Sequence, residues 1–192
     1  MNSSLKQMIA VGALLFTTTS YAQTNNNQDH SAHHPIKAVD TKPSAAVQEN
    51  SSLQVVFDKY FALKDALVKS DGNTASAKAN ELVTSINGVQ MNQLAEDQHT
   101  LWMKVMKNLV FDAEHIGETK SVDHQRDHFN TLSDNMYQLI KVSKQETPVY
   151  YQHCPMANKG KGANWLSKED AIKNPYYGSR MLTCGKTVET IK

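Results

Sequence analysis

The sequence predicts an all-α fold, an antiparallel four-helix bundle that carries an irregular C-terminal appendage. Three observations predict it. Apolar residues recur every three or four positions through most of residues 52–147, which is the period of one helix face. Short turn signals interrupt this period, so the helices are expected to be joined by short connections and to pack antiparallel. The period ends before residues 148–192, a segment that holds both cysteines and three of the five prolines.

Each helix of the bundle is predicted from its own apolar period and its end signals. The helices are expected over residues 52–70, 73–86, 92–118 and 122–144. Asn73 is a candidate N-cap for the second helix, which Gly88 ends. Gly117 marks the end of the third helix, and Pro148 stops the fourth.

His124 and His128 lie four residues apart on the fourth predicted helix, and His115 lies near the end of the third. Side chains four apart are neighbours on a helix surface, so one metal ion can reach both. The alternative is a solvated flank of the helix with no ligand role. His124 and His128 are therefore secondary candidates as metal ligands.

The appendage at residues 148–192 is too apolar for a disordered tail. We expect it to pack on the bundle through its aromatic side chains, which are Tyr150, Tyr151, Trp165, Tyr176 and Tyr177. Ser167 is a modest N-cap signal and Asn174-Pro175 is a stop signal, so one short helix is predicted between them.

Two clusters of soft metal ligands bracket this predicted short helix. The first contains His153, Cys154 and Met156, and the second contains Met181 and Cys184. Thiolate and thioether sulfurs suit Cu(I), and imidazole adds a borderline donor. These five side chains are the candidate metal ligands, with copper as Cu(I), or silver, as the expected ion.

A structural disulfide between Cys154 and Cys184 is the competing hypothesis. Residues 154–184 form a loop of 31 residues, and closing such a loop stabilises a fold by about 3–4 kcal/mol in the chain-entropy model. The spacing does not decide between metal and disulfide. The two states can also alternate, because reduced thiols bind copper and oxidation releases it.

Residues 1–22 have the pattern of a secretory signal peptide. Lys6 gives a positive start, residues 8–16 are an apolar run, and Ala22 is a small residue before the cut. The run is too short to span a bilayer. We expect cleavage near Ala22-Gln23, no transmembrane segment afterwards, and a periplasmic or secreted chain in a compartment that permits disulfides.

We expect residues 23–51 to form a disordered linker, because they are rich in polar residues and poor in apolar ones. The linker carries His30, His33 and His34. Imidazoles on a flexible segment can capture a borderline metal ion, so His33 and His34 are further secondary candidates. The alternative is a soluble linker with no ligand role.

The composition excludes several classes of protein. The chain has 192 residues, and 20 Lys and Arg balance 19 Asp and Glu, so it lacks the basic excess of a nucleic-acid-binding domain. Two cysteines are too few for a disulfide scaffold. No G-x-S-x-G, glycine-rich phosphate loop or H-E-x-x-H motif occurs, and we expect no enzymatic activity.

Four strings of the tail, together with residues 123–133, resemble a bacterial periplasmic family of unknown function. The strings are Cys154-Pro155-Met156-Ala157, Gly162-Ala163-Asn164-Trp165-Leu166-Ser167, Ile172-Lys173-Asn174-Pro175-Tyr176-Tyr177-Gly178 and Met181-Leu182-Thr183-Cys184-Gly185. Members occur alone or fused to membrane-fusion subunits of copper and silver efflux pumps. The resemblance extends over residues 53–192, and it implies copper handling by a stand-alone member.

Two functions are therefore expected as alternatives. The first is a periplasmic copper or silver binding protein, a buffer or chaperone in metal efflux and resistance, with an efflux membrane-fusion subunit as a candidate partner. The second is an interaction module of an efflux system that binds no metal. In that case Cys154 and Cys184 form a structural disulfide, and Tyr150, Tyr176 and Tyr177 anchor the partner unless they are buried against the bundle.

Overall fold

The computed structural model describes residues 45–192, with side chains from Ser52 onward. The predicted signal peptide and the linker histidines lie outside the described residues. The helices are α1 (Ala45–Val68), α2 (Gly72–Asn87), α3 (Glu96–Glu118) and α4 (Val122–Val142). The strands that follow are β1 (Val149–Cys154), β2 (Ala163–Ser167) and β3 (Lys186–Ile191).

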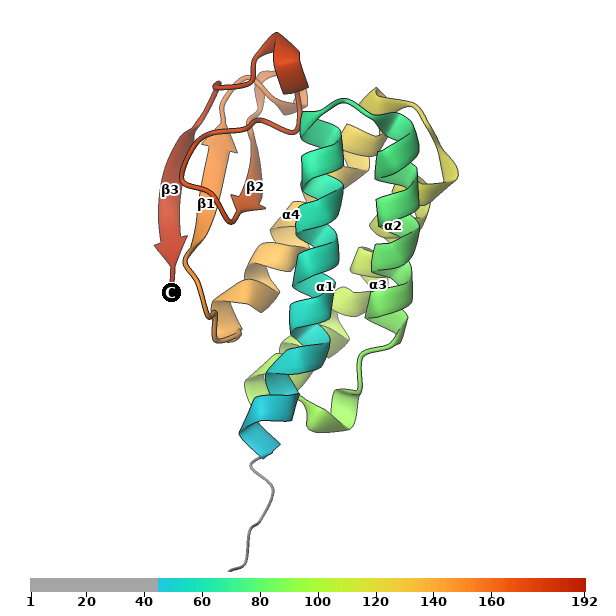
Figure 1. The fold of residues 1–192 in the computed structure, drawn as a ribbon, viewed down its shortest axis with the longest axis vertical. Helices are drawn as coiled ribbons and strands as arrows, with labels where there is room; N and C mark the ends of the chain where they lie inside the picture. The colour runs from blue at the N-terminus through green and yellow to red at the C-terminus, as the bar shows by residue number, and fades with distance from the viewer. Residues whose placement is uncertain (1–44) are drawn as a thin grey trace, which may run out of the picture. The chain divides into compact units, whose positions relative to one another are not determined.

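The helical bundle is confirmed. Successive helices run in opposite directions and are joined by short connections (Figure 1). α1 begins at Ala45, before the predicted start at Ser52. The N-cap of α2 is Asp71 instead of Asn73, and its carboxylate accepts a hydrogen bond of 3.0 Å from the backbone N–H of Thr74. None of the described helices is long and apolar enough to cross a membrane.

The bundle is held by one apolar face from each helix. Large side chains from all four helices are almost fully buried, among them Phe57, Tyr60, Leu82, Trp102, Leu109, Phe129 and Met136. Full burial of a large apolar side chain contributes about 1.5–3 kcal/mol. The period of three and four in the sequence therefore corresponds to the real core.

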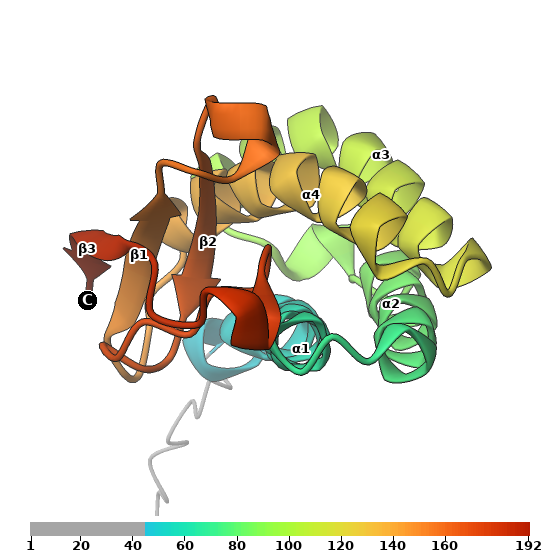
Figure 2. The same ribbon diagram turned by 90° about the horizontal axis from the view of Figure 1, so that it is seen from above.

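The tail is irregular only in part, because it contains a small antiparallel sheet, so the all-α expectation is wrong for β1, β2 and β3. β1 pairs antiparallel with both β2 and β3, and the strand order is β2-β1-β3. The sheet lies beside α1 and α4, on the side of the bundle away from α2 (Figure 2). β1 is rich in aromatic and β-branched residues, but both faces of the sheet are partly covered, so no polar and apolar alternation marks it.

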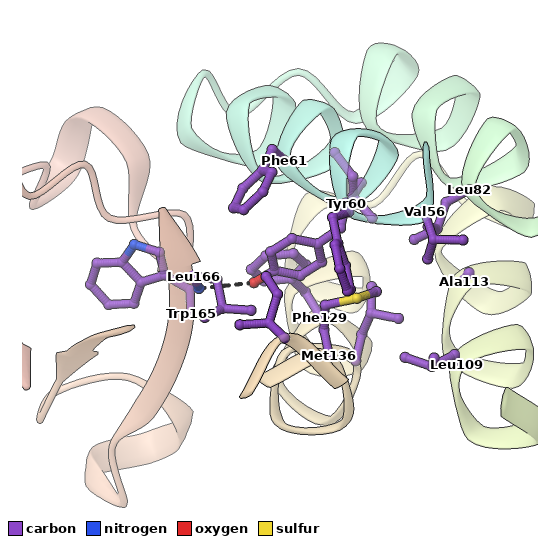
Figure 3. Close-up of a cluster of buried hydrophobic side chains, with 14 of the residues drawn as sticks. Val56, Tyr60, Phe61, Leu82, Leu109, Ala113, Phe129, Met136, Trp165 and Leu166 are labelled. Carbon is purple, nitrogen blue, oxygen red and sulfur yellow. Dashed lines mark hydrogen bonds between the residues drawn. The ribbon is translucent and has the colours of Figure 1, made fainter. Parts of the chain in front are cut away.

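A buried hydroxyl of α1 contributes to the attachment of the sheet to the bundle. The Tyr60 hydroxyl of α1 is buried, accepts a hydrogen bond of 3.1 Å from the Leu166 N–H of β2, and lies 2.8 Å from the Ser133 hydroxyl of α4. Figure 3 shows Leu166 pointing to the bundle and its neighbour Trp165 pointing away from it. The two faces of β2 therefore have different roles, one toward the bundle and one away.

The segment 168–185 covers the outer face of the sheet without forming the predicted short helix. Ser167 continues β2, so it caps no helix. The buried Gln152 side chain donates to the carbonyl oxygens of Glu169 and Asp170, at 3.1 and 3.0 Å. These two carbonyls therefore accept hydrogen bonds from a distant strand, whereas in a helix they would accept them from N–H groups four residues ahead.

Arg126 of α4 ties the covering segment to the helices. Its Nε donates to the Pro175 carbonyl at 2.7 Å, and its Nη2 donates to the Leu67 carbonyl at 3.2 Å and the Ser70 hydroxyl at 2.9 Å. Burial lowers the pKa of Arg126 from its ordinary value. The guanidinium therefore joins the C-terminal end of α1, α4 and the tail in one network.

Candidate functional site

The two cysteines of the chain meet at the end of the sheet. Cys154 is the last residue of β1, and Cys184 lies just before β3. Their Sγ atoms are 3.0 Å apart, and both thiols are free. Cys154 is fully buried, whereas Cys184 is partly exposed. The pair is therefore a buried thiol with a second thiol above it that solvent can reach.

Strand geometry places Cys154 under the covering segment. Cys154 pairs with Ala163, and Gln152 pairs with Trp165, so these four side chains share the outer face of the sheet. Pro155 follows directly and removes the N–H that a longer strand would need. β1 therefore stops at the residue that presents the sulfur.

Gly185 lets the chain bring Cys184 close to β1. Its φ is +144°, a conformation that L side chains rarely adopt. A Cβ at this position would lie 2.7 Å from the His153 carbonyl oxygen and 2.9 Å from the Trp165 ring. Only glycine therefore fits between Cys184 and the start of β3.

Asn174 sets the path of the covering segment. Its buried side chain donates from Nδ2 to the Cys184 carbonyl at 2.8 Å. Its Oδ1 accepts from the N–H groups of Tyr176 at 2.8 Å and Tyr177 at 3.3 Å, which is an Asx turn. One amide therefore fixes both the turn after Pro175 and the backbone of the second cysteine.

The contact with Cys154 affects the proton of the Cys184 thiol. The hydrogen bond with Cys154, followed by burial, raises the pKa of Cys184 above its ordinary value of 9.0. A thiol must lose its proton before it binds a metal or attacks a disulfide. A soft metal ion that binds Cys184 therefore has to displace a proton that the contact with Cys154 holds more tightly.

The other three predicted ligands lie apart from this contact. His153 is on the opposite face of β1 from Cys154, and its Nδ1 lies 2.8 Å from the Asn164 Oδ1. Met156 and Met181 are 53% and 38% exposed. The structure therefore brings together two of the five predicted ligands, both of them cysteines.

The secondary candidate metal ligands that the structure describes lie outside the cysteine contact. His124 and His128 are neighbours on α4, with ring centroids 4.9 Å apart. His33 and His34 lie outside the described residues. Within residues 52–192, no three His, Cys, Asp or Glu side chains already stand in the arrangement of a metal site.

Sequence reasoning missed the role of Asn174 and the partners of the helical histidines. Asn174-Pro175 was interpretable as a turn, because Asn side chains bond to the backbone two and three residues on. No local pattern showed that His115 of α3 lies beside His128 of α4, with ring centroids 4.8 Å apart. That contact depends on how two helices pack.

Comparison with known proteins assigns a family resemblance to the helical part only. The model of a family described as "Protein of unknown function (DUF3347)" matches residues 56–147. The helical bundle is similar to a protein family of unknown function. The match ends before β1 begins at Val149, so it includes neither cysteine. No curated protein matches the chain, and no solved structure matches it.

Proposed function

We propose that this protein binds a soft metal ion, copper as Cu(I) or silver, through Cys154 and Cys184. We propose further that it acts in the periplasm as a metal buffer or chaperone of efflux and resistance. The observation that carries the proposal is the 3.0 Å contact between two free thiols. Two thiolates are ligands of the kind that Cu(I) prefers.

The surroundings of the pair suit an ion that enters and leaves. Cys184 is partly exposed and lies in a turn, where its N–H donates to the Met181 carbonyl at 3.1 Å. The pair widens when a metal enters, since metal–thiolate bonds of about 2.3 Å hold two sulfurs farther apart than they are now. The movement falls on the Cys184 turn, because Cys154 is fixed in the sheet.

Met156 and Met181 are proposed as supplementary ligands. Met156 is two residues from Cys154, and Met181 is three residues from Cys184. Both side chains are exposed, so they lose little packing when they turn toward an ion. His153 is a weaker candidate, because its ring lies on the other face of β1 and is already bonded to Asn164.

The predicted signal peptide and the resemblance of the tail strings to domains of copper and silver efflux systems also support the proposal. Within it, a membrane-fusion subunit of an efflux pump is the candidate partner. No enzymatic step is proposed.

A structural disulfide is the second candidate, and the same contact favours it. Cys154 and Cys184 need to approach by only about 1 Å to reach the bond length of a disulfide. The bond would hold the covering segment on the sheet, as an interaction module requires. Of the three tyrosines expected as anchors, Tyr176 is only 7% exposed, and the Tyr177 hydroxyl donates to the Met156 carbonyl at 2.6 Å.

An anaerobic Cu(I) titration against a competing chromophoric chelator separates the two candidates. Untreated and thiol-reduced samples of the secreted chain are compared. We expect one Cu(I) per chain, bound only after reduction, and loss of this binding in the double variant Cys154→Ser and Cys184→Ser. If the reduced protein binds no Cu(I) and the untreated protein contains the disulfide, the cysteines are structural.

The methionines are tested in the same titration. The double variant Met156→Ala and Met181→Ala is expected to bind Cu(I) at least tenfold more weakly. Met103→Ala is the matched control, because Met103 is 53% exposed on α3 and belongs to no proposed site. Equal affinity of the double variant and the control would remove the methionines from the ligand set.

A further inference from the structure

Three histidines meet where α3 ends and α4 begins. His115 comes from the last turn of α3, and His124 and His128 come from the first two turns of α4. The ring centroids of His115 and His128 are 4.8 Å apart, and those of His124 and His128 are 4.9 Å apart. The central imidazole of the cluster is therefore His128.

Two of these rings are held through the same nitrogen. The His115 Nδ1 lies 2.9 Å from the Phe111 carbonyl oxygen. A carbonyl only accepts hydrogen bonds, so Nδ1 is the donor, and Nε2 is the nitrogen left to face a metal ion. Phe111 also packs on the His115 ring, with centroids 4.2 Å apart. The ring is therefore fixed in both tautomer and position.

A buried carboxylate holds the His128 ring through its Nδ1. The His128 Nδ1 lies 3.1 Å from Oδ1 of Asp112, a residue that is only 4% exposed. The other oxygen of Asp112 accepts a hydrogen bond of 2.7 Å from the Thr131 hydroxyl, which aims the carboxylate. A histidine whose Nδ1–H bonds to a carboxylate and whose Nε2 is free has the second-shell arrangement of a metal ligand.

The third ring is free to turn. His124 is exposed, and its position one helical turn before His128 puts both on one face of α4. The three rings do not converge on one point as they stand. Metal–imidazole bonds of about 2.0–2.1 Å in a tetrahedral site place ring centroids about 5 Å apart, which is close to the two centroid distances measured here.

We propose that His115, His124 and His128 form a metal site for a borderline divalent cation of the Zn²⁺ and Cu²⁺ class. Imidazole nitrogen suits these ions, and Asp112 supplies a negative charge behind the ligands. The site is separate from the thiol pair in both its residues and its ligand type. The proposal does not rest on Cu(I) binding by the cysteines.

A Zn²⁺ titration followed by the imidazole ¹⁵N resonances tests this site locally. The secreted chain is used with His30, His33 and His34 replaced by alanine, so that the linker histidines contribute nothing. We expect the Nε2 signals of His115, His124 and His128 to shift together. The shifts should saturate when one Zn²⁺ is bound per three-histidine cluster. Signals of the three rings that stay in place up to millimolar Zn²⁺ would overturn the proposal.

Variants give an independent readout. His115→Ala and His124→Ala are each expected to weaken Zn²⁺ binding at this site at least tenfold, while His99→Ala leaves it unchanged. His99 is the matched control because it is an exposed histidine on α3 outside the cluster. Equal affinity in all three variants would refute the site, whereas Cu(I) binding by the reduced thiols is unaffected by any of them.

Discussion

Replacement of Asn174 by alanine tests whether one buried amide holds the cysteine site together. The side chain makes three hydrogen bonds, one to the Cys184 carbonyl and two from the backbone N–H groups of the turn. Each bond contributes about 0.5–1.5 kcal/mol, and a buried group left without a partner costs about 1–3 kcal/mol. We therefore expect Asn174→Ala to destabilise the covering segment by about 2–4 kcal/mol.

The loss is local, because Asn174 bonds only to residues of its own segment. Cys154 is fully buried beneath that segment, so a reagent reaches its thiol only after local opening. A destabilisation of 2–4 kcal/mol raises the open fraction by a factor of about 30–1000. The alkylation rate of Cys154 in the reduced native protein is expected to rise by the same factor.

The alkylation rate is followed by mass spectrometry of the peptide that contains Cys154. Asn135→Ala is the matched control, since the Asn135 amide bonds only to a carbonyl of its own helix at the surface. We expect the control to alkylate at the rate of the unmodified protein. A rate for Asn174→Ala within twofold of that value, with the helical content intact, would show that the amide does not hold the site.

Three further predictions concern stability. Tyr60→Phe removes the hydroxyl that accepts from β2 and is expected to lower the unfolding free energy in urea by about 2–3 kcal/mol. No loss would mean that this hydrogen bond does not hold the sheet on the bundle. Gly185→Ala is expected to lower the free energy of unfolding by about 2 kcal/mol or more. Gly160→Ala is expected to lower it less, because a Cβ at Gly160 meets no atom within 4 Å. Equal losses in the two variants would contradict the close approach of Gly185 to β1. The hydrogen bond from Lys59, with a second lysine beside it, lowers the pKa of Glu81 from its ordinary 4.5 to about 2. The stabilisation by Glu81 is therefore complete above pH 4.5 and lost as the pH falls to about 2. Glu81→Gln should lower the urea midpoint of unfolding at pH 6 and not at pH 2. An equal difference at both pH values would show that the ion pairs of Glu81 do not stabilise the fold.

The helices were predictable because helix signals are local. Side chains three and four residues apart share a face, so the apolar period shows the buried stripe before any tertiary contact is known. Where a boundary differed, a neighbouring polar residue did the capping, as Asp71 does in place of Asn73. Helix ends are set by which of two nearby side chains reaches a free N–H.

The sheet was not predictable from the same kind of reasoning. β1 bonds to β3 across more than thirty residues, and its two faces meet the bundle and the covering segment. A strand that is covered on both sides loses the polar and apolar alternation by which strands are usually found. The segment after β2 failed to become a helix because Gln152 bonds to its carbonyls from a distant strand.

The sequence by itself determined the helical bundle, and it showed that the tail carries soft candidate ligands, among them both cysteines. Only the tertiary structure decided that Cys154 and Cys184 touch, that His153 turns away from them, and that His115 joins His128. Residue type decides which chemistry is available, and it is local. Which side chains share a point in space depends on strand register and helix packing, which join residues far apart in the chain.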